Sequence, residues 1–281
     1  LFGLGFAGVV LALRKRPEEV STRLLAAGAL GMPIAFVLGY LLYNLVPFEP
    51  FSLGVDFAQW FYLPLCYLAV TLPFFFSGLT IAALLTRHAR RIHRLYLFDL
   101  LGAGCGSGLV ILALPALGGS GAVFAAASLA AAGAALVARE HNLRWTAAAC
   151  AIGVALAIIT PFSEGLLPVR ISSNKVFGKV LADPQRNIFS TWNTISRIDV
   201  VKYYERGRER RSILIDAGTA LTRLARPRSG LRSLAPGGGD EDFFYLMHSA
   251  ARVLIVGSGG GREVLMALRN GAQQVECTIN G

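Results

Sequence analysis

The stretch RVLIVGSGGG, at residues 252–261, decides the fold of the C-terminal part of the chain. Its first five residues are mostly apolar and predict a buried strand, which runs directly into a glycine-rich turn. Residues 262–270 then predict a helix, a Gly-Ala pair ends that helix, and residues 274–279 predict a second strand. Strand, glycine turn, helix and strand form the opening of a doubly wound nucleotide-binding fold.

The glycines of this turn indicate a ligand site. Because glycine has no Cβ, the backbone can approach a ligand closely, and the following helix offers free N–H groups and the positive end of its dipole. A dinucleotide fingerprint requires G-x-G-x-x-G, whereas this chain has the shorter G-x-G-x-G, which favours an S-adenosylmethionine-type fold. We therefore predict cofactor-binding residues in and beside the turn: Gly257, Ser258, Gly259, Gly261 and Glu263. The alternative is that the glycines only make a tight turn between strand and helix.

The segment before this turn has the pattern of a small β domain. Residues 197–203 and 211–215 predict two strands, and the charged residues between them predict the turn of an antiparallel hairpin. Residues 240–250 have helical spacing. After residue 163 the chain carries 17 of its 27 basic residues, but no nucleic-acid recognition motif accompanies them. We therefore expect no nucleic-acid partner, and we assign this charge to a solvated surface or to contact with lipid headgroups.

The composition of the first 162 residues is that of a membrane domain. Hydrophobic residues make up 54% of the 281-residue chain and charged residues 16%, whereas a soluble domain carries about 25% charged residues. Only six of the 17 acidic residues precede residue 163. This composition excludes a fully soluble enzyme, a disordered chain and a disulfide scaffold. The four cysteines show no paired spacing, so we expect reduced core residues and no metal site.

Several apolar runs reach the length of a transmembrane helix, for which roughly 20 residues are needed. We predict spans at residues 24–48, 60–86, 95–117 and 145–162, and an Ala-rich run at 121–138 that is either a fifth span or a buried helix. The chain begins with Leu1 rather than Met, so we expect residues 1–13 to be the remainder of a truncated first span. The predicted domains are therefore a polytopic membrane domain (1–162), a β-hairpin subdomain with a linker helix (163–250) and the start of a Rossmann-like domain (251–281). We expect an integral protein of a bacterial cell membrane, with the lipid bilayer as a partner.

The loops between these runs predict a topology that conflicts with the expected cofactor. Basic residues gather at 14–23, 87–94 and 139–144, and residues 49–59 contain none. If every run spans, the three basic loops share one side, which the positive-inside rule makes cytoplasmic. The C-terminal part would then lie on the other side, although a domain that uses a cytosolic nucleotide-like donor is expected in the cytoplasm.

Two features inside the run at 95–117 have competing interpretations. Asp99 is either a proton or substrate site or, as we prefer, an interfacial carboxylate paired with Arg91 or Arg94. The alternating glycines of this run resemble a nucleotide loop, but their position in a span favours close helix packing: Gly102, Gly104, Gly106 and Gly108.

Six segments together resemble one protein family. In the membrane half they are PFFFSGLTIAALLT (73–86) and LYLFDLLGAGCGSG (95–108). In the second half they are WNTISRIDV (192–200), ILIDAG (213–218), EDFFY with a following histidine (241–248) and VLIVGSGGGREVL (253–265). These segments are similar to the polytopic membrane branch of the spermidine synthase family, the polyamine aminopropyltransferases.

The resemblance implies an aminopropyltransferase whose donor is decarboxylated S-adenosylmethionine and whose acceptor is a polyamine such as putrescine. It implies substrate-side roles for Asp216 and Tyr245, although Asp216 is equally a turn residue before Gly218 and Tyr245 equally a packing residue of a helix. The chain departs from the family where Thr278 replaces the acid that closes the second strand and binds ribose. Residues 219–222 likewise lack the donor-site glutamine of soluble members. The catalytic aspartate segment is expected beyond residue 281, so the catalytic residues are unknown and we expect the chain as it stands to be inactive.

Two other functions remain open at this stage. An S-adenosylmethionine-dependent methyltransferase fits the same glycine turn, because donor choice depends on whether the pocket around the donor's amino-acid end is cationic or acidic. A non-catalytic transporter or scaffold with a ligand-sensing domain is the alternative from another class, although only one carboxylate lies well inside the apolar runs. The oligomeric state, including a homo-oligomer, is also open.

Overall fold

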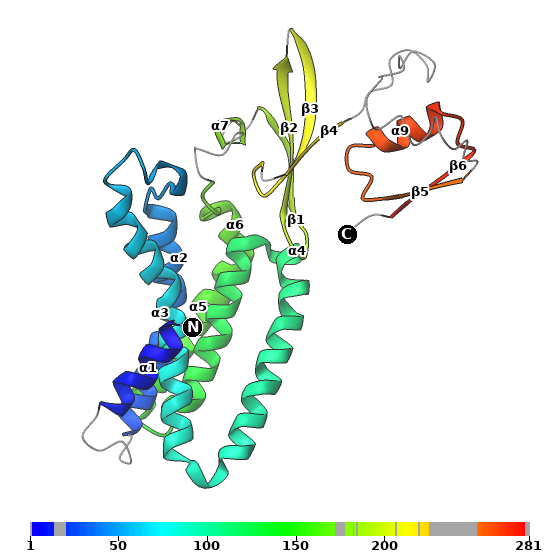
Figure 1. Ribbon diagram of the computed structural model, residues 1–281. Coiled ribbons are helices and arrows are strands. Elements are labelled where there is room, and N and C mark those ends of the chain that lie inside the picture. Colours follow the sequence, from blue (N-terminus) through cyan, green and yellow to red (C-terminus); the bar gives the residue numbers. More distant parts are fainter. Residues whose placement is uncertain are drawn as a thin grey trace. The chain divides into compact units, whose positions relative to one another are not determined.

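The computed structural model describes residues 2–13, 21–171, 178–181, 183, 185–205, 207–218, 220–224 and 252–278. The chain divides into two compact units, Leu1–Asn174 and Lys175–Gly281. The first is helical, and the second contains two small sheets (Figure 1). The predicted order of apolar helices followed by a small sheet region is therefore confirmed.

The first unit is built from long apolar helices. They are α1 (Phe2–Ala12), α2 (Thr22–Leu45), α3 (Gln59–Arg87), α4 (Ile92–Ala138) and α5 (Leu143–Ile159), with short turns η1 (Pro50–Ser52), η2 (Ala89–Arg91), η3 (Thr160–Phe162) and α6 (Ser163–Leu166). Within the described residues, four helices are long and apolar enough to cross a membrane, namely Thr22–Leu45, Gln59–Arg87, Ala89–Ala138 and Leu143–Leu166. The predicted runs at 60–86 and 145–162 fall in these helices, and the run at 24–48 does so up to Leu45, where α2 ends.

Helix α4 contains the two predicted runs at 95–117 and 121–138 and reverses direction between them. Gly118 breaks the helix with φ 72° and ψ −179°. Arg87, just before α4, forms an ion pair of 3.4 Å with Glu140, just after it, so both ends of α4 lie together. The helix is therefore two limbs, residues 92–117 and 119–138, that fold back on one another (Figure 1).

The second limb of α4 packs through small side chains, as the Ala-rich sequence predicts. Ala127, Ala131, Ala134 and Ala138 are buried, and Ala134 joins Ala29 of α2 and Ala149 of α5 in one cluster. Small residues at such positions let helix backbones approach closely, which is the main source of packing between helices in lipid. The run at 121–138 is thus a packed helix of the bundle.

The reversal at Gly118 is held by a carboxylate from another element. Glu164 of α6 accepts hydrogen bonds from the backbone N–H of Ser120 (3.2 Å) and from its hydroxyl (2.6 Å). The carboxylate thereby caps the N-terminus of the second limb, where N–H groups lack helical partners. The first unit includes α6 and extends past residue 162, to Asn174.

The first limb of α4 does not pack as its glycines predict. A methyl group added at Gly102, Gly104, Gly106 or Gly108 would meet no other described element within 4 Å, so the predicted close packing is not found within the described residues. Asp99, on the same limb, is exposed. No ion pair joins it to Arg91 or Arg94 within the described residues, so the preferred pairing is also not found.

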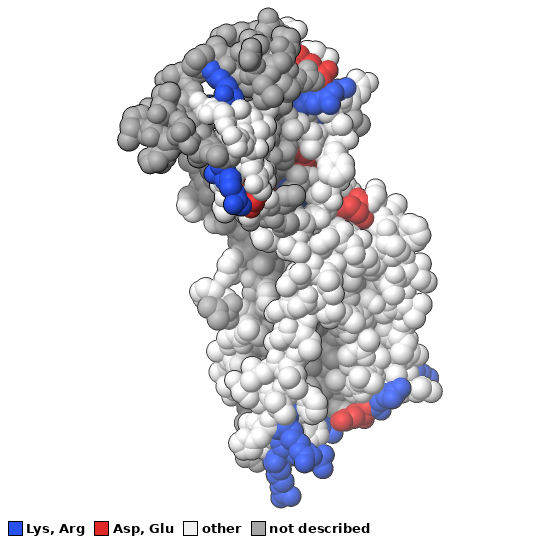
Figure 2. Space-filling view, turned by 90° about the vertical axis from the view of Figure 1, so that its right-hand side faces the viewer, with Lys and Arg blue, Asp and Glu red and all other residues white. Residues whose placement is uncertain are grey.

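The two ends of the helical unit differ in charge. At one end, the Arg87–Glu140 pair and a contact of 3.3 Å between Thr22 Oγ1 and His141 Nδ1 bring together the start of α2, the α3–α4 turn and the α4–α5 connection, where the described basic residues of this unit gather. At the other end, the Tyr40 hydroxyl donates to the carbonyl of Leu167 (2.6 Å). The chain therefore leaves the bundle at the end opposite the basic loops. Between its two ends, the face seen in Figure 2 carries almost no charged side chains.

The second unit begins with an antiparallel sheet of four strands in the order β1 (Asn187–Trp192), β2 (Arg197–Glu205), β3 (Arg208–Ile215) and β4 (Ala220–Arg223), beside the short helix α7 (Gly178–Leu181). The predicted hairpin is confirmed as β2 and β3. Its strands are longer than predicted, since pairing continues to Glu205 and Arg208, and the turn is correspondingly tighter. A separate parallel pair follows, β5 (Arg252–Val256) and β6 (Gln274–Thr278), connected through α9 (Arg262–Arg269).

Candidate nucleotide-binding turn

The unit β5–α9–β6 has the parallel topology that the glycine stretch predicts. Its strands pair in register from Arg252 with Gln274 to Val256 with Thr278. Ile255 packs with Ala267 of α9 and Ala272 in a small core. A parallel pair requires a crossover, and here the helix supplies it. Only this two-stranded opening is described, and it does not by itself establish a complete Rossmann fold.

The strand before the turn is half-buried rather than fully buried. Ile255 faces the small core, whereas Leu254 is 62% and Val256 70% exposed. The prediction of a buried strand therefore holds for one face only. The reason is that α9 covers one face of the pair, and no described element covers the other.

Three glycines of the turn adopt a backbone conformation that other residues rarely take. Their φ angles are 73° at Gly257, 49° at Gly259 and 80° at Gly261. A side chain at such angles is crowded by the backbone at a cost of about 1–2 kcal/mol, so glycine is favoured at all three positions. Gly257 donates its N–H to the carbonyl of Thr278 (3.2 Å), and Gly261 donates to the carbonyl of Ser258 (2.9 Å). The residues predicted from the sequence are thus brought together in one loop between β5, β6 and α9.

The first turn of α9 presents polar groups beside the glycines. Gly261 occupies the N-cap position, and no side chain caps the helix there. Glu263 lies in this first turn and is exposed, as is Arg262. An acidic side chain at this position is favoured by the helix dipole, and it is also suitably placed to meet a cationic ligand group.

One residue next to the turn was missed by sequence reasoning. A Cβ built on Gly259 would lie 3.0 Å from Cγ2 and 3.2 Å from Oγ1 of Thr222, on β4. The side chain of Thr222 therefore lies against the glycine turn, and a hydroxyl from the antiparallel sheet reaches the candidate site. The resemblance to the aminopropyltransferases places a donor-site residue near 219–222. It gives no reason to select Thr222 among these residues.

Asp216 has the role of a turn residue. Its φ is 49°, and Ala217 follows with φ 59°. Its Oδ1 accepts a hydrogen bond from the N–H of Arg197 (3.0 Å), and its own N–H donates to the carbonyl of Arg197 (2.9 Å). Aspartate tolerates the left-handed region and commonly closes turns in this way. The structure therefore accounts for Asp216 as the residue that ties the β3–β4 turn to the start of β2.

A buried ion pair lies next to this turn and was also missed. Asp199 is fully buried and accepts from Arg197 Nη2 at 3.0 Å and from the hydroxyl of Ser190. Its second oxygen, Oδ2, has no hydrogen-bond partner among the residues that the structure describes. Arg197 and Asp199 both lie on β2, and the Ser190 hydroxyl connects Asp199 to β1. The backbone of Arg197 is also the group that holds Asp216. No local pattern marks it, because a single aspartate within a strand is ordinarily read as solvated.

Two further predicted features lie outside the described residues. They are Tyr245, with the helix predicted around it at 240–250, and the chain after Thr278. Among the residues that the structure describes, no group of three or more His, Cys, Asp or Glu is placed to hold a metal ion.

Comparisons with protein family models, with curated proteins and with solved structures found no match.

Proposed function

We propose that the chain is a membrane-bound member of the spermidine synthase-like aminopropyltransferases, whose second unit binds decarboxylated S-adenosylmethionine in the glycine turn for transfer to a polyamine. The observation that supports this proposal is the parallel β5–α9–β6 unit, with three left-handed glycines between strand and helix. Such a turn admits the backbone of the protein to within contact distance of a small ligand.

Each group around the turn would have a separate role in binding the donor. The open backbone at Gly257, Gly259 and Gly261 would accommodate the amino end of the donor, with Ser258 between the first two. Glu263 would face its cationic groups, and the Thr222 hydroxyl would contribute a hydrogen bond from the other sheet. A carboxylate at this place favours the decarboxylated donor, because intact S-adenosylmethionine carries a carboxylate of its own there. Transfer itself is a displacement in which an uncharged amine attacks the carbon next to the sulfonium, forming a C–N bond as the C–S bond breaks and methylthioadenosine leaves.

A titration of both donors onto the full chain in lipid nanodiscs tests this proposal. Wild type is expected to bind the decarboxylated donor more tightly than S-adenosylmethionine. Gly259→Ala is expected to abolish binding, because the new methyl group would lie 3.0 Å from Thr222 Cγ2 at a φ of 49°, so the turn proposed to hold the donor has to shift. Gly271→Ala is the matched control, since Gly271 also has a positive φ of 90° but follows α9 at its far end.

The other outcomes distinguish the competing functions. Tighter binding of intact S-adenosylmethionine would favour the methyltransferase. Absence of binding for both donors, in a chain whose helices are correctly inserted, would contradict the proposal and favour a membrane scaffold or transporter.

The proposal also assigns the second unit to the cytoplasm, because the donor is made there. The basic loops lie at the opposite end of the bundle, so this orientation opposes the positive-inside rule.

Cys277 on β6 offers a direct test of the orientation, since the other three cysteines lie in α3, α4 and α5. A membrane-impermeant maleimide applied to intact cells is expected to leave Cys277 unlabelled until the cells are opened, with Cys277→Ser as the control. Labelling in intact cells would contradict the cytoplasmic assignment.

A further inference from the structure

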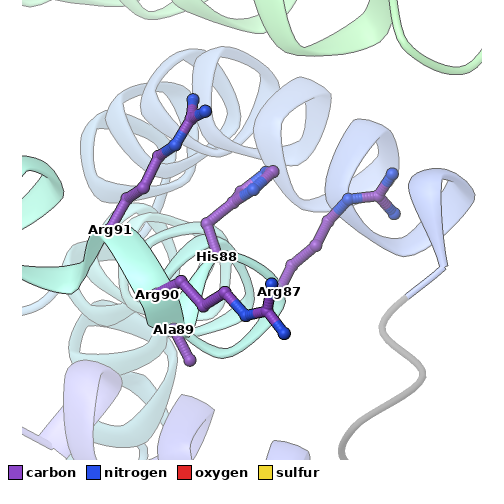
Figure 3. A pocket seen from close by; sticks show the side chains of 5 residues that line it. All are labelled: Arg87, His88, Ala89, Arg90 and Arg91. Carbon is purple, nitrogen blue, oxygen red and sulfur yellow. The ribbon is translucent and has the colours of Figure 1, made fainter.

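The turn between α3 and α4 contains a basic cavity that the proposed transferase does not use. The cavity has a volume of about 490 Å³ and is lined by Arg87, His88, Ala89, Arg90 and Arg91. Figure 3 shows the side chains of this turn, with His88 between Arg87 and Arg91. The turn connects two apolar helices that are long enough to span a membrane, so the cavity lies where the hydrocarbon ends and the headgroup layer begins.

The cavity has an excess of positive charge. Glu140 is bound to Arg87 at 3.4 Å. Within the part of the chain that the structure describes, the side chains of His88, Arg90 and Arg91 make no hydrogen bond or ion pair. Two guanidinium groups and an imidazole therefore line a cavity without an acceptor from the described protein.

The helix that leaves this turn has an apolar surface to match. Along the first limb of α4, Tyr96, Leu97 and Leu101 are all more than half exposed. No described helix covers the middle of this limb. A basic cavity beside an uncovered apolar helix has the two parts needed to bind an amphiphile, namely a site for an anionic head and a surface for acyl chains.

From this arrangement we infer that the cavity binds the phosphate headgroup of an anionic phospholipid, whose acyl chains lie along the first limb of α4. One guanidinium group can donate two parallel N–H···O hydrogen bonds to the oxygens of a phosphate, which a lysine ammonium group does not do. A lipid rather than free phosphate is the occupant, because the cavity opens at the depth where lipid phosphates are concentrated. Arg139 and Arg144 at the same end of the bundle add to the attraction for an anionic surface without lining the cavity.

The test measures lipid preference with the purified full chain in bilayers of phosphatidylcholine. Spin-labelled phosphatidylglycerol and phosphatidylcholine report the fraction of each lipid that the protein immobilises. Wild type is expected to prefer phosphatidylglycerol, and R90Q/R91Q is expected to lower this preference about fivefold. R139Q/R144Q removes the same charge from the same end and is expected to keep most of the preference.

Three results would overturn the inference. Equal losses in R90Q/R91Q and R139Q/R144Q would show attraction to the general charge of this end rather than to the cavity. R90K/R91K keeps the charge and the membrane orientation. Full retention of the preference for phosphatidylglycerol in this variant would show that bidentate guanidinium contacts are not used. Complete competition by inorganic phosphate would identify a site for the free anion instead of a lipid.

Discussion

Two glycine series in this chain look alike in sequence and differ in structure. The series at 102–108 and the series at 257–261 both place glycine at alternate positions. The first lies within helix α4, with no described atom within 4 Å of any added Cβ. In the second, Gly257, Gly259 and Gly261 all have positive φ. Spacing alone therefore does not distinguish a left-handed glycine turn from a run of helical glycines; the backbone conformation of the glycines does.

The largest effect on stability is expected at Gly118, which breaks α4. Gly118→Ala places a Cβ 2.6 Å from Oε2 of Glu164 at a φ of 72°. Steric conflict and backbone strain together are expected to cost about 3 kcal/mol, measured by reversible unfolding in mixed micelles.

Gly133→Ala provides the matched control in the same helix, because it has open space and no positive φ. It is expected to leave stability unchanged or to raise it by up to about 1 kcal/mol. Equal stability of the two variants would show that the chain does not reverse at Gly118.

A smaller effect is expected when alanine replaces one glycine of each series. Gly261→Ala has open space but a φ of 80°, so backbone strain alone is expected to lower the free energy of unfolding by about 1–2 kcal/mol. Gly108→Ala, in a regular helix, is expected not to lower it. Thermal unfolding of each unit, followed in nanodiscs, gives both values, and a Gly261→Ala variant as stable as wild type would contradict the left-handed turn.

The Thr222 contact predicts a change in binding with little change in fold. Thr222→Val keeps the shape of the side chain and removes the hydroxyl next to Gly259. We expect affinity for the decarboxylated donor to fall about fivefold, as for the loss of one hydrogen bond of about 1 kcal/mol. Thr222→Ser, which keeps the hydroxyl, is expected to bind nearly as well as wild type; equal weakening in both variants would assign the effect to packing.

The smallest effect is expected in the membrane series. Gly104→Ala adds a methyl group where the described chain has open space, so stability is expected to stay within about 1 kcal/mol of wild type. A loss larger than this, or dissociation of an oligomer in cross-linking, would show that another helix packs against these glycines. That result would restore the close packing that the sequence predicts and place it between chains.

Features set by neighbouring residues were predictable from the sequence. The parallel β5–α9–β6 unit, the β2–β3 hairpin and the apolar helices follow from local periodicity and from the positions of glycine.

Features set by contacts between residues far apart in the sequence were not predictable. The break in α4 is held by Glu164, which accepts hydrogen bonds from Ser120, 44 positions earlier in the sequence. The contact of Thr222 with Gly259 joins two sheets, and the Arg197–Asp199 pair is buried only because neighbouring strands cover it. The exposed face of β5 likewise depends on which elements cover the sheet, and strand sequence does not specify those.

Hydrogen–deuterium exchange on the full chain in nanodiscs tests the central claim most directly. When decarboxylated S-adenosylmethionine is added at saturation, peptides covering residues 256–265 are expected to exchange more slowly, because the donor covers the open backbone of the turn. Peptides covering residues 102–108 are expected to exchange at the same rate with and without the donor. Unchanged exchange at 256–265, or donor-dependent protection confined to 102–108, would contradict the assignment of the turn as the donor site.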